Sequence, residues 1–303
     1  MTRNRSLFTE ADVPDQTGKV FLVTGANTGL GYEVTRVLAA KGGRVLLACR
    51  DEAKGQAAVR GISELHPKAE LRVIPYDQAD LDSIRRAVDA VESESRLDVL
   101  VNNAGVMVPP LSRTKQGFEL QFGVNHLGCF ALTGLLLPKL EEAGDARLVI
   151  TSSIAHKKGK LDWDDLNAEK SYKRGERYGA SKLANALFLY ELDRRLRSAH
   201  STVKAVGCHP GIATTELSRH IFGGTVLTAL LGPLFNTPAM GAWPTLQAAT
   251  GDVSSGDYFG PQGLADMRGR SGPARRTAQA TDPTLAKRLW DVSVEMTGID
   301  PRV

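Results

Sequence analysis

Short apolar runs rich in leucine and β-branched residues alternate along most of the chain with longer stretches of helical periodicity. This alternation is typical of a parallel β-sheet, in which each strand is followed by a helical crossover. The pattern predicts six strands, at about 20–24, 44–49, 71–76, 98–102, 148–152 and 203–208. We therefore expect an α/β fold: a single-domain, Rossmann-type, doubly wound parallel sheet with helices on both faces.

The intervening stretches predict helices at about 30–43, at 52–67, after Asp80 as an N-cap, and from Tyr178 to about Arg197. Residues 1–18 are a polar extension, and residues 19–303 form one domain. The segment 211–240 interrupts the alternation with glycine, proline and an apolar run. Because it follows the carboxyl end of a strand, where open sheets of this kind bind ligands, it is a candidate substrate loop.

Composition narrows the class of protein. The 303 residues are 42% hydrophobic and 24% charged, and no run reaches the ~18 uninterrupted apolar residues of a membrane span. Residues 1–19 lack the apolar core of a secretory signal, so we expect a cytoplasmic protein. The net charge of +4 is slight and its basic clusters are short, which argues against nucleic acid as a partner. Three widely spaced cysteines and scattered histidines predict neither disulfides nor a metal site.

Tyr178 and Lys182 stand four residues apart in a predicted helix. That spacing places both on one face, where a phenol and an ammonium can share a cleft. A nearby positive charge favours the phenolate, so Lys182 would lower the pKa of Tyr178 and allow it to exchange a proton with a substrate oxygen. The same spacing also arises where tyrosine packs against a helix and lysine is solvated, so the pair needs support from other motifs.

A glycine-rich loop at 24–31, Thr-Gly-Ala-Asn-Thr-Gly-Leu-Gly, joins the first predicted strand to the first helix. Gly25 permits a tight turn, and Gly29 and Gly31 allow the backbone to approach a dinucleotide and the helix to approach the sheet. The helix N-terminus and its N–H groups favour a pyrophosphate at this point. A Walker loop is excluded because the Gly-Lys-Ser/Thr ending is absent.

With these motifs the chain resembles the short-chain dehydrogenase/reductase family from about Lys19 to its C-terminus. The glycine loop is joined by Asn-Asn-Ala-Gly at 102–105, a helix asparagine at Asn125, a serine at Ser153, the Tyr178/Lys182 pair, and Pro-Gly at 210–211 with Thr215 beyond. The order and spacing of all of them agree with the family.

The resemblance, together with the chemistry of carbonyl reduction, implies four catalytic residues. Ser153 and Tyr178 would bind the substrate oxygen, with Tyr178 as proton donor in reduction and base in oxidation. Lys182 would lower the pKa of Tyr178 and hold the nicotinamide ribose, and Asn125 would position a water that relays protons to Lys182. The cofactor would be bound by Gly25, Asn27, Thr28, Gly29, Leu30, Gly31, Arg50, Asp77, Asn103, Ala104, Gly105, Tyr178, Lys182, Pro210, Gly211 and Thr215.

The end of the second predicted strand decides between cofactors. NAD-specific relatives carry an acid there that binds the ribose hydroxyls, whereas here Cys49 occupies that position and Arg50 follows. A guanidinium can bind a 2′-phosphate with two hydrogen bonds, so NADP(H) is favoured over NAD(H). Asp51 is better interpreted as the N-cap of the next helix.

The long interval between Ser153 and Tyr178 resembles the same interval in one branch of the family, which comprises retinol dehydrogenases, WW-domain oxidoreductase and protochlorophyllide reductases. The branch implies a hydrophobic carbonyl or alcohol as substrate, and apolar residues at 221–235 could form a lid over it. The same residues could instead form an ordinary helix packed against the sheet or a contact with a membrane surface. Family members commonly pair through helices, and the apolar face of Leu183, Leu187, Phe188 and Tyr190 would permit a homodimer or homotetramer. Packing against the sheet within one chain would use the same residues. The alternative to an enzyme is a non-catalytic NADP-binding sensor or scaffold protein on the same fold. His156 and His209 lie near the site motifs and are most often satisfied polar residues.

Overall fold

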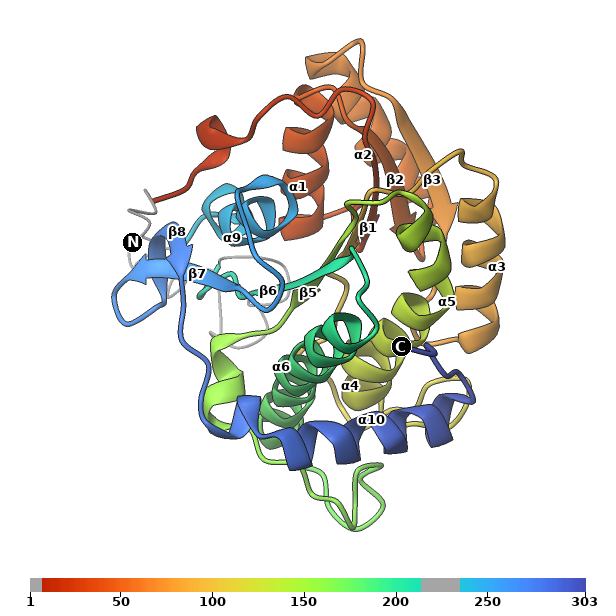
Figure 1. Cartoon of the computed structure of the whole chain (residues 1–303), viewed down its shortest axis with the longest axis vertical. Helices are drawn as coiled ribbons and strands as arrows, with labels where there is room; N and C mark the ends of the chain where they lie inside the picture. The colour runs from red at the N-terminus through yellow and green to blue at the C-terminus, as the bar shows by residue number, and fades with distance from the viewer. Residues whose placement is uncertain (1–6, 214–234) are drawn as a thin grey trace.

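A single sheet forms the centre of the protein (Figure 1), in a computed structural model that describes residues 7–213 and 235–303. The strand order is β3-β2-β1-β4-β5-β6-β7-β8; β1 to β7 are parallel and β8 is antiparallel to β7. The chain passes from β1 outward to β3 and then returns to β4 on the other side of β1. The crevice of a doubly wound fold therefore lies between β1 and β4. The strands are β1 (Val20–Thr24), β2 (Arg44–Cys49), β3 (Leu71–Pro75), β4 (Val99–Asn102), β5 (Arg147–Thr151), β6 (Lys204–Cys208), β7 (Tyr258–Gly263) and β8 (Arg268–Pro273).

Helices cover both faces of the sheet and build two apolar cores. On one face, α1, α2 and α9 pack around buried residues such as Val34, Ile62 and Leu246. On the other face, α3, α5, α6 and α10 contribute residues such as Phe130 and Phe188. The helices are α1 (Gly29–Ala40), α2 (Glu52–Leu65), α3 (Leu81–Glu92), α4 (Leu120–Phe122), α5 (Cys129–Glu142), α6 (Arg174–Ser198), α9 (Pro238–Thr250) and α10 (Pro283–Thr297), with a π-helical turn (Gly123–Gly128) between α4 and α5.

The predicted fold class is confirmed, and the predicted strands agree with the structure within one residue at each end. Asp51 and Asp80 are N-caps, as expected: their carboxylates accept hydrogen bonds from the backbone N–H groups of Lys54 and Asp82. The helix that carries Tyr178 begins earlier than predicted, at Arg174. The prediction also omitted α5, α9, α10 and the β7–β8 hairpin.

The C-terminal helix α10 lies along α6 on the outside of the molecule (Figure 1). It covers the face of α6 that was expected to be available for pairing between copies: Leu183 and Leu187 pack in the same cluster as Leu289, and the ring of Phe188 lies 6.0 Å from that of Trp290. The alternative use of these residues, packing within one chain, is therefore what the structure shows for Leu183, Leu187 and Phe188. A homodimer or homotetramer stays a prediction and would need another surface.

Among the described residues, one helical stretch, Leu120–Glu142, has the length and composition to cross a membrane. It comprises α4, the π-helical turn and α5, and 83% of its most apolar window is buried inside the protein. Such burial is typical of the central helix of a protein core, and this helix packs in the same core as α3 and α6.

We expect Trp290→Ala to lower the free energy of unfolding by about 3–5 kcal/mol, because it removes a large buried aromatic side chain. The indole packs edge-on to Phe130 with ring centroids 5.1 Å apart, and the guanidinium of Arg195 lies 4.3 Å from its centroid. Urea unfolding measures the loss. Leu65→Ala is the control, because Leu65 is 64% exposed and its truncation should cost about 0.5 kcal/mol or less. Equal effects of the two variants would contradict the assigned role of α10.

Candidate active site

The glycine loop at the end of β1 has the geometry that a dinucleotide requires. Gly25 and Gly29 have φ angles of 66° and 56°, in the left-handed region that favours glycine. Gly31 lies so close to this turn that an added Cβ would overlap the carbonyl oxygen of Gly25 and lie 2.7 Å from Asn103 Nδ2. A side chain there would separate α1 from the loop, so the sequence motif serves a close approach of backbone to backbone.

The loops after β1 and β4 are held together through Thr24. Its hydroxyl accepts hydrogen bonds from the backbone N–H groups of Asn103 (3.0 Å) and Ala104 (2.9 Å). Its carbonyl accepts one from Asn103 Nδ2 at 2.9 Å. The two motifs therefore form one rigid edge of the crevice.

Beside this edge lies a cavity of about 470 Å³. Its size and its position next to the N-terminus of α1 fit the adenosine and phosphate part of a dinucleotide. Two cations, Arg50 and Lys54, line it; Lys54 was not singled out from the sequence, although it stands four residues after Arg50 in the first turn of α2. Eleven predicted cofactor-binding residues also line the cavity: Gly25, Asn27, Thr28, Gly29, Leu30, Gly31, Arg50, Asp77, Asn103, Ala104 and Gly105.

Three catalytic candidates come from the end of β5 and from α6. Ser153 follows β5 and caps a short 3-10 helix (Ile154–Lys158), and its side chain is near enough to the Tyr178 hydroxyl to lower the pKa of Tyr178. The Lys182 ammonium lies 5.9 Å from the centroid of the Tyr178 ring and donates to the Thr151 carbonyl at 3.4 Å. Tyr178 and Lys182 therefore lie on the side of α6 that faces Ser153, as their spacing predicts.

Burial dominates the electrostatics of these groups. It raises the pKa of Tyr178 above its usual value of 10, and the hydrogen bond from Ser153 acts in the opposite direction. Burial also lowers the pKa of Lys182 to about 8, because Lys182 is only 5% exposed. The ammonium therefore stays mostly charged at neutral pH while being easier to deprotonate than a solvated lysine.

Asn125 lies in the π-helical turn, a feature often found at functional sites. Its amide brackets the backbone of Val106: Oδ1 accepts from the Val106 N–H at 2.7 Å, and Nδ2 donates to the Val106 carbonyl at 2.9 Å. Nδ2 also donates to Ser181 Oγ at 2.9 Å. Both amide hydrogens are thus used within the protein, and one acceptor position on Oδ1 is left for a water.

Gly105 links the cavity to the catalytic cluster. An added Cβ at this position would lie 2.9 Å from Asn125 Oδ1 and 3.4 Å from Lys182 Nζ. Since Gly105 also lines the cavity, the dinucleotide site and the cluster of Ser153, Tyr178, Lys182 and Asn125 are continuous.

Pro210 and Gly211 follow β6. Helix α9 lies between Pro210 and the glycine loop: an added Cβ at Gly241 of α9 would lie 2.6 Å from Leu30 and 3.8 Å from Pro210. The carbonyl of Pro210 accepts a hydrogen bond from Asn236 Nδ2 at 3.0 Å. Thr215 and residues 221–234 of the expected lid lie outside the described residues.

Two histidines flank the site and contact its backbone rather than the cavity. His156 is buried, and its Nδ1 lies 2.6 Å from the carbonyl oxygen of Ser153, an arrangement in which the ring donates to the carbonyl. His209 Nδ1 accepts a hydrogen bond from the backbone N–H of Gly211 at 3.3 Å. Burial lowers the pKa of both imidazoles, to about 4 for His209, so both are neutral at pH 7.

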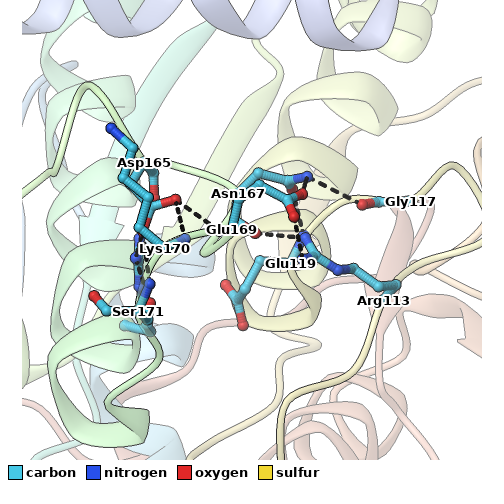
Figure 2. Close-up of polar contacts among 9 residues, drawn as sticks. Arg113, Gly117, Glu119, Asp165, Asn167, Glu169, Lys170 and Ser171 are labelled. Carbon is cyan, nitrogen blue, oxygen red and sulfur yellow. Dashed lines mark hydrogen bonds and ion pairs between the residues drawn. The ribbon is translucent and has the colours of Figure 1, made fainter.

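Contacts of residues 165–171 hold the segment between Ser153 and Tyr178 in place (Figure 2). Asn167 Oδ1 accepts from the Glu119 N–H at 2.7 Å, and Asn167 Nδ2 donates to the Gly117 carbonyl at 3.2 Å. The Arg113 guanidinium pairs with Glu169 at 3.1 Å. These contacts tie the segment to the loop that precedes α4, and hence to the helix that carries Asn125.

Asp165 fastens the same segment to the first turn of α6. It is 5% exposed, and its carboxylate accepts from the N–H groups of Glu169 (2.6 Å), Lys170 (3.2 Å) and Ser171 (3.3 Å) (Figure 2). It also pairs with Arg177 at 2.6 Å, directly before Tyr178. Burial alone would raise the pKa of Asp165, but the backbone N–H groups and Arg177 outweigh it and hold this pKa below its usual value. Sequence spacing could not reveal this network, because it depends on how a long loop folds back.

Comparison with known proteins agrees with this geometry. The family model for short chain dehydrogenases matches residues 19–224. Human retinol dehydrogenase 13 is 42% identical over 294 residues, covering 93% of this chain and 86% of the relative, and human retinol dehydrogenase 14 is 39% identical over 307 residues, covering 93% and 87%. The chain belongs to the short-chain dehydrogenase family, in its retinol dehydrogenase-like branch, and is an NAD(P)-dependent oxidoreductase acting on CH-OH donors.

Solved structures share the fold. An uncharacterised protein from Mycobacterium Paratuberculosis is 38% identical, with a TM-score of 0.83 over 98% of this chain and 100% of the other. L-sorbose reductase from Gluconobacter frateurii, complexed with NADPH and L-sorbose, is 18% identical with a TM-score of 0.63 over 80% of this chain and 95% of the other, and shows the shared fold.

Asp165→Asn should lower the melting temperature at pH 7, because the Arg177 guanidinium and three backbone N–H groups lose a charged acceptor. The folded-state pKa of Asp165 is depressed, so its contribution to stability is present above the unfolded-state value of about 3.9 and is lost as pH falls through the folded pKa. The difference in melting temperature between wild type and variant should therefore shrink below about pH 4. Asp164→Asn, at the exposed neighbouring residue, is the control; a D165N variant that melts like D164N at pH 7 would contradict the role of the network.

Proposed function

We propose that this protein is an NADP-dependent oxidoreductase that interconverts a hydrophobic carbonyl compound and its alcohol, with Tyr178 as the acid/base. The observation that carries the proposal is the grouping of Tyr178 with Ser153 and Lys182, at the Gly105 end of a cavity that fits a dinucleotide. The similarity to retinol dehydrogenases favours an apolar substrate, and retinal belongs in the test panel for that reason.

When bound, the nicotinamide cofactor supplies or accepts the hydride. The protein's own groups manage the substrate oxygen: the hydroxyls of Ser153 and Tyr178 hold it, and Tyr178 donates its proton in reduction. The charge of Lys182, 5.9 Å from the centroid of the Tyr178 ring, favours the phenolate that remains. Asn125 holds the Val106 backbone in place and offers Oδ1 to a water that returns a proton toward Lys182.

NADP(H) is favoured over NAD(H) by the charges at the end of β2. Arg50, Asp51 and Lys54 all line the cavity, and one carboxylate oxygen of Asp51 caps α2 by accepting from the Lys54 N–H at 3.0 Å. Two cations beside a carboxylate that is already engaged favour a phosphate over free ribose hydroxyls.

The catalytic role of Tyr178 is tested by Tyr178→Phe. We expect NADPH binding, measured by fluorescence titration, to be retained, while carbonyl reduction falls by about 10²–10⁴-fold because the proton donor is gone. Tyr190→Phe, in the same helix and outside the site, is the matched control and should keep wild-type turnover. Normal turnover by Y178F would overturn the mechanism. Binding of NADPH by the wild type without turnover of any aldehyde, ketone or alcohol in the panel would support the sensor alternative.

The cofactor preference is tested with Arg50→Ala. Wild type should show a higher kcat/KM for NADPH than for NADH, and R50A should lower the NADPH value by about tenfold or more while changing the NADH value little, because a charge-assisted hydrogen bond of about 1.5–3 kcal/mol is lost. Arg60→Ala removes an exposed arginine of α2 that does not line the cavity and is the control. An efficiency ratio near one in the wild type would defeat the assignment.

A further inference from the structure

Two glycines bring the catalytic serine and tyrosine segments into backbone contact. Gly159 ends the short helix that Ser153 begins, and Gly179 directly follows Tyr178 in α6. An added Cβ at Gly159 would overlap the carbonyl oxygen of Gly179 and lie 2.9 Å from the Cβ of Leu183. From the other side, an added Cβ at Gly179 would lie 3.3 Å from both the Ala155 carbonyl oxygen and the Gly159 Cα.

The glycine at 159 is required by space rather than by backbone conformation. Its φ of −63° and ψ of 145° are extended values that any L-residue adopts. An alanine there would keep its local conformation comfortably and would still force the two segments apart, because a backbone carbonyl and a helix Cβ cannot move out of the way as a flexible side chain can.

The serine segment is rigid enough to transmit such a displacement. The Ser153 carbonyl accepts from the His156 backbone N–H at 3.0 Å and from the His156 ring, and the Ser153 hydroxyl accepts from the Ala155 N–H at 3.2 Å. The Gly159 N–H donates to the His156 carbonyl at 3.1 Å. Hydrogen bonds within residues 153–159 therefore connect this segment from end to end, so a displacement of Gly159 also displaces Ser153.

We infer that the contact between Gly159 and Gly179 sets the separation of the Ser153 and Tyr178 hydroxyls, which makes Gly159 a positioning residue of the active site. The importance of this separation for turnover rests on the proposed function, in which both hydroxyls hold one substrate oxygen. The separation itself is a property of the protein alone and can be measured without a substrate.

Turnover gives the first test. Gly159→Ala should lower kcat by about 10–100-fold, the scale of effect that a misplacement near 1 Å produces, with NADPH affinity unchanged because the cavity is lined by other segments. Gly175→Ala is the matched control: it lies in the first turn of the same helix, an added Cβ meets nothing within 4 Å, and alanine favours the helix. A G159A variant with the kcat of G175A would overturn the inference.

The second test is independent of turnover and uses the ¹³Cζ resonance of Tyr178, assigned by its absence from Tyr178→Phe. The hydrogen bond from Ser153 lowers the pKa of Tyr178, so a wider separation should move the titration of this resonance to higher pH in G159A and leave it unchanged in G175A. Ser153→Ala should produce the same upward shift. Adding G159A to S153A should then shift it no further, since both act through one hydrogen bond.

These outcomes separate the inference from the proposed function. An upward shift in G159A that disappears in the S153A background supports the positioning role even if no substrate in the panel is turned over. A wild-type titration in G159A, or an equal shift with and without Ser153, would overturn it. If G159A does not fold, Gly179→Ala decides in its place: its closest contacts are 3.3 Å, so the same shift should appear at a smaller size, and its absence would overturn the inference.

Discussion

The attachment of helix α6 to the end of β5 is the constraint on which the active site depends. The Ser152 hydroxyl donates to the Lys182 carbonyl at 2.7 Å, so the strand is bonded to the helix backbone at the turn that carries the catalytic lysine. Lys182 Nζ and Asn185 Nδ2 both donate to the Thr151 carbonyl, at 3.4 and 3.1 Å. Because these bonds come from successive turns of one helix face, they fix both its distance from the strand and its rotation. Tyr178, one turn earlier on the same face, takes its place relative to Ser153 as a consequence.

A second attachment performs the same task on the cofactor side. Thr24 at the end of β1 receives three hydrogen bonds from Asn103 and Ala104, and the sheet pairs β1 with β4 beneath them. Gly105 follows this clamp and lies beside both Asn125 and Lys182. The carboxyl ends of β1, β4 and β5 are thus connected by short polar contacts across the crevice. Adjacent parallel strands end at one edge of the sheet, so motifs that are far apart in sequence meet there without long side chains.

The sequence predicts those parts of the fold whose pattern of apolar and polar positions is compatible with only one type of element. β1 and β2 are buried along nearly their whole length, and two short, mostly apolar runs predicted them to the residue. One run ends at the glycine loop, and the other lies between Gly43 and Arg50. α5 was missed because its own residues are apolar on nearly all of its faces. Its sequence therefore lacks the alternation of apolar and polar positions that marks a surface helix. β7 and β8 were missed because glycine and proline interrupt both, in Tyr-Phe-Gly-Pro-Gln-Gly and Arg-Gly-Arg-Ser-Gly-Pro. β8 is an edge strand, where proline is tolerated, and β7 pairs with β6 only at Tyr258 and Phe259, before its own proline. The motif residues were found by spacing, whereas Asp165 acts through contacts that only the folded loop creates.

Lys182 is a buried charge in the active site, and its presence there needs a functional explanation. A buried charge on the same helix has charged partners: Glu191, which is fully buried, pairs with Arg194 and Arg195, both at 2.7 Å. Among the described residues, Lys182 has only a carbonyl acceptor at 3.4 Å, which it shares with Asn185, and burial lowers its pKa to about 8. Since the unfolded chain holds this proton more tightly, keeping Lys182 charged at neutral pH reduces stability, and that loss is relieved as pH rises from about 8 toward the unfolded value near 10.4. A fold that needed only stability would place an apolar residue there. A buried ammonium held between Tyr178 and the end of the dinucleotide cavity is instead explained by chemistry that uses its charge.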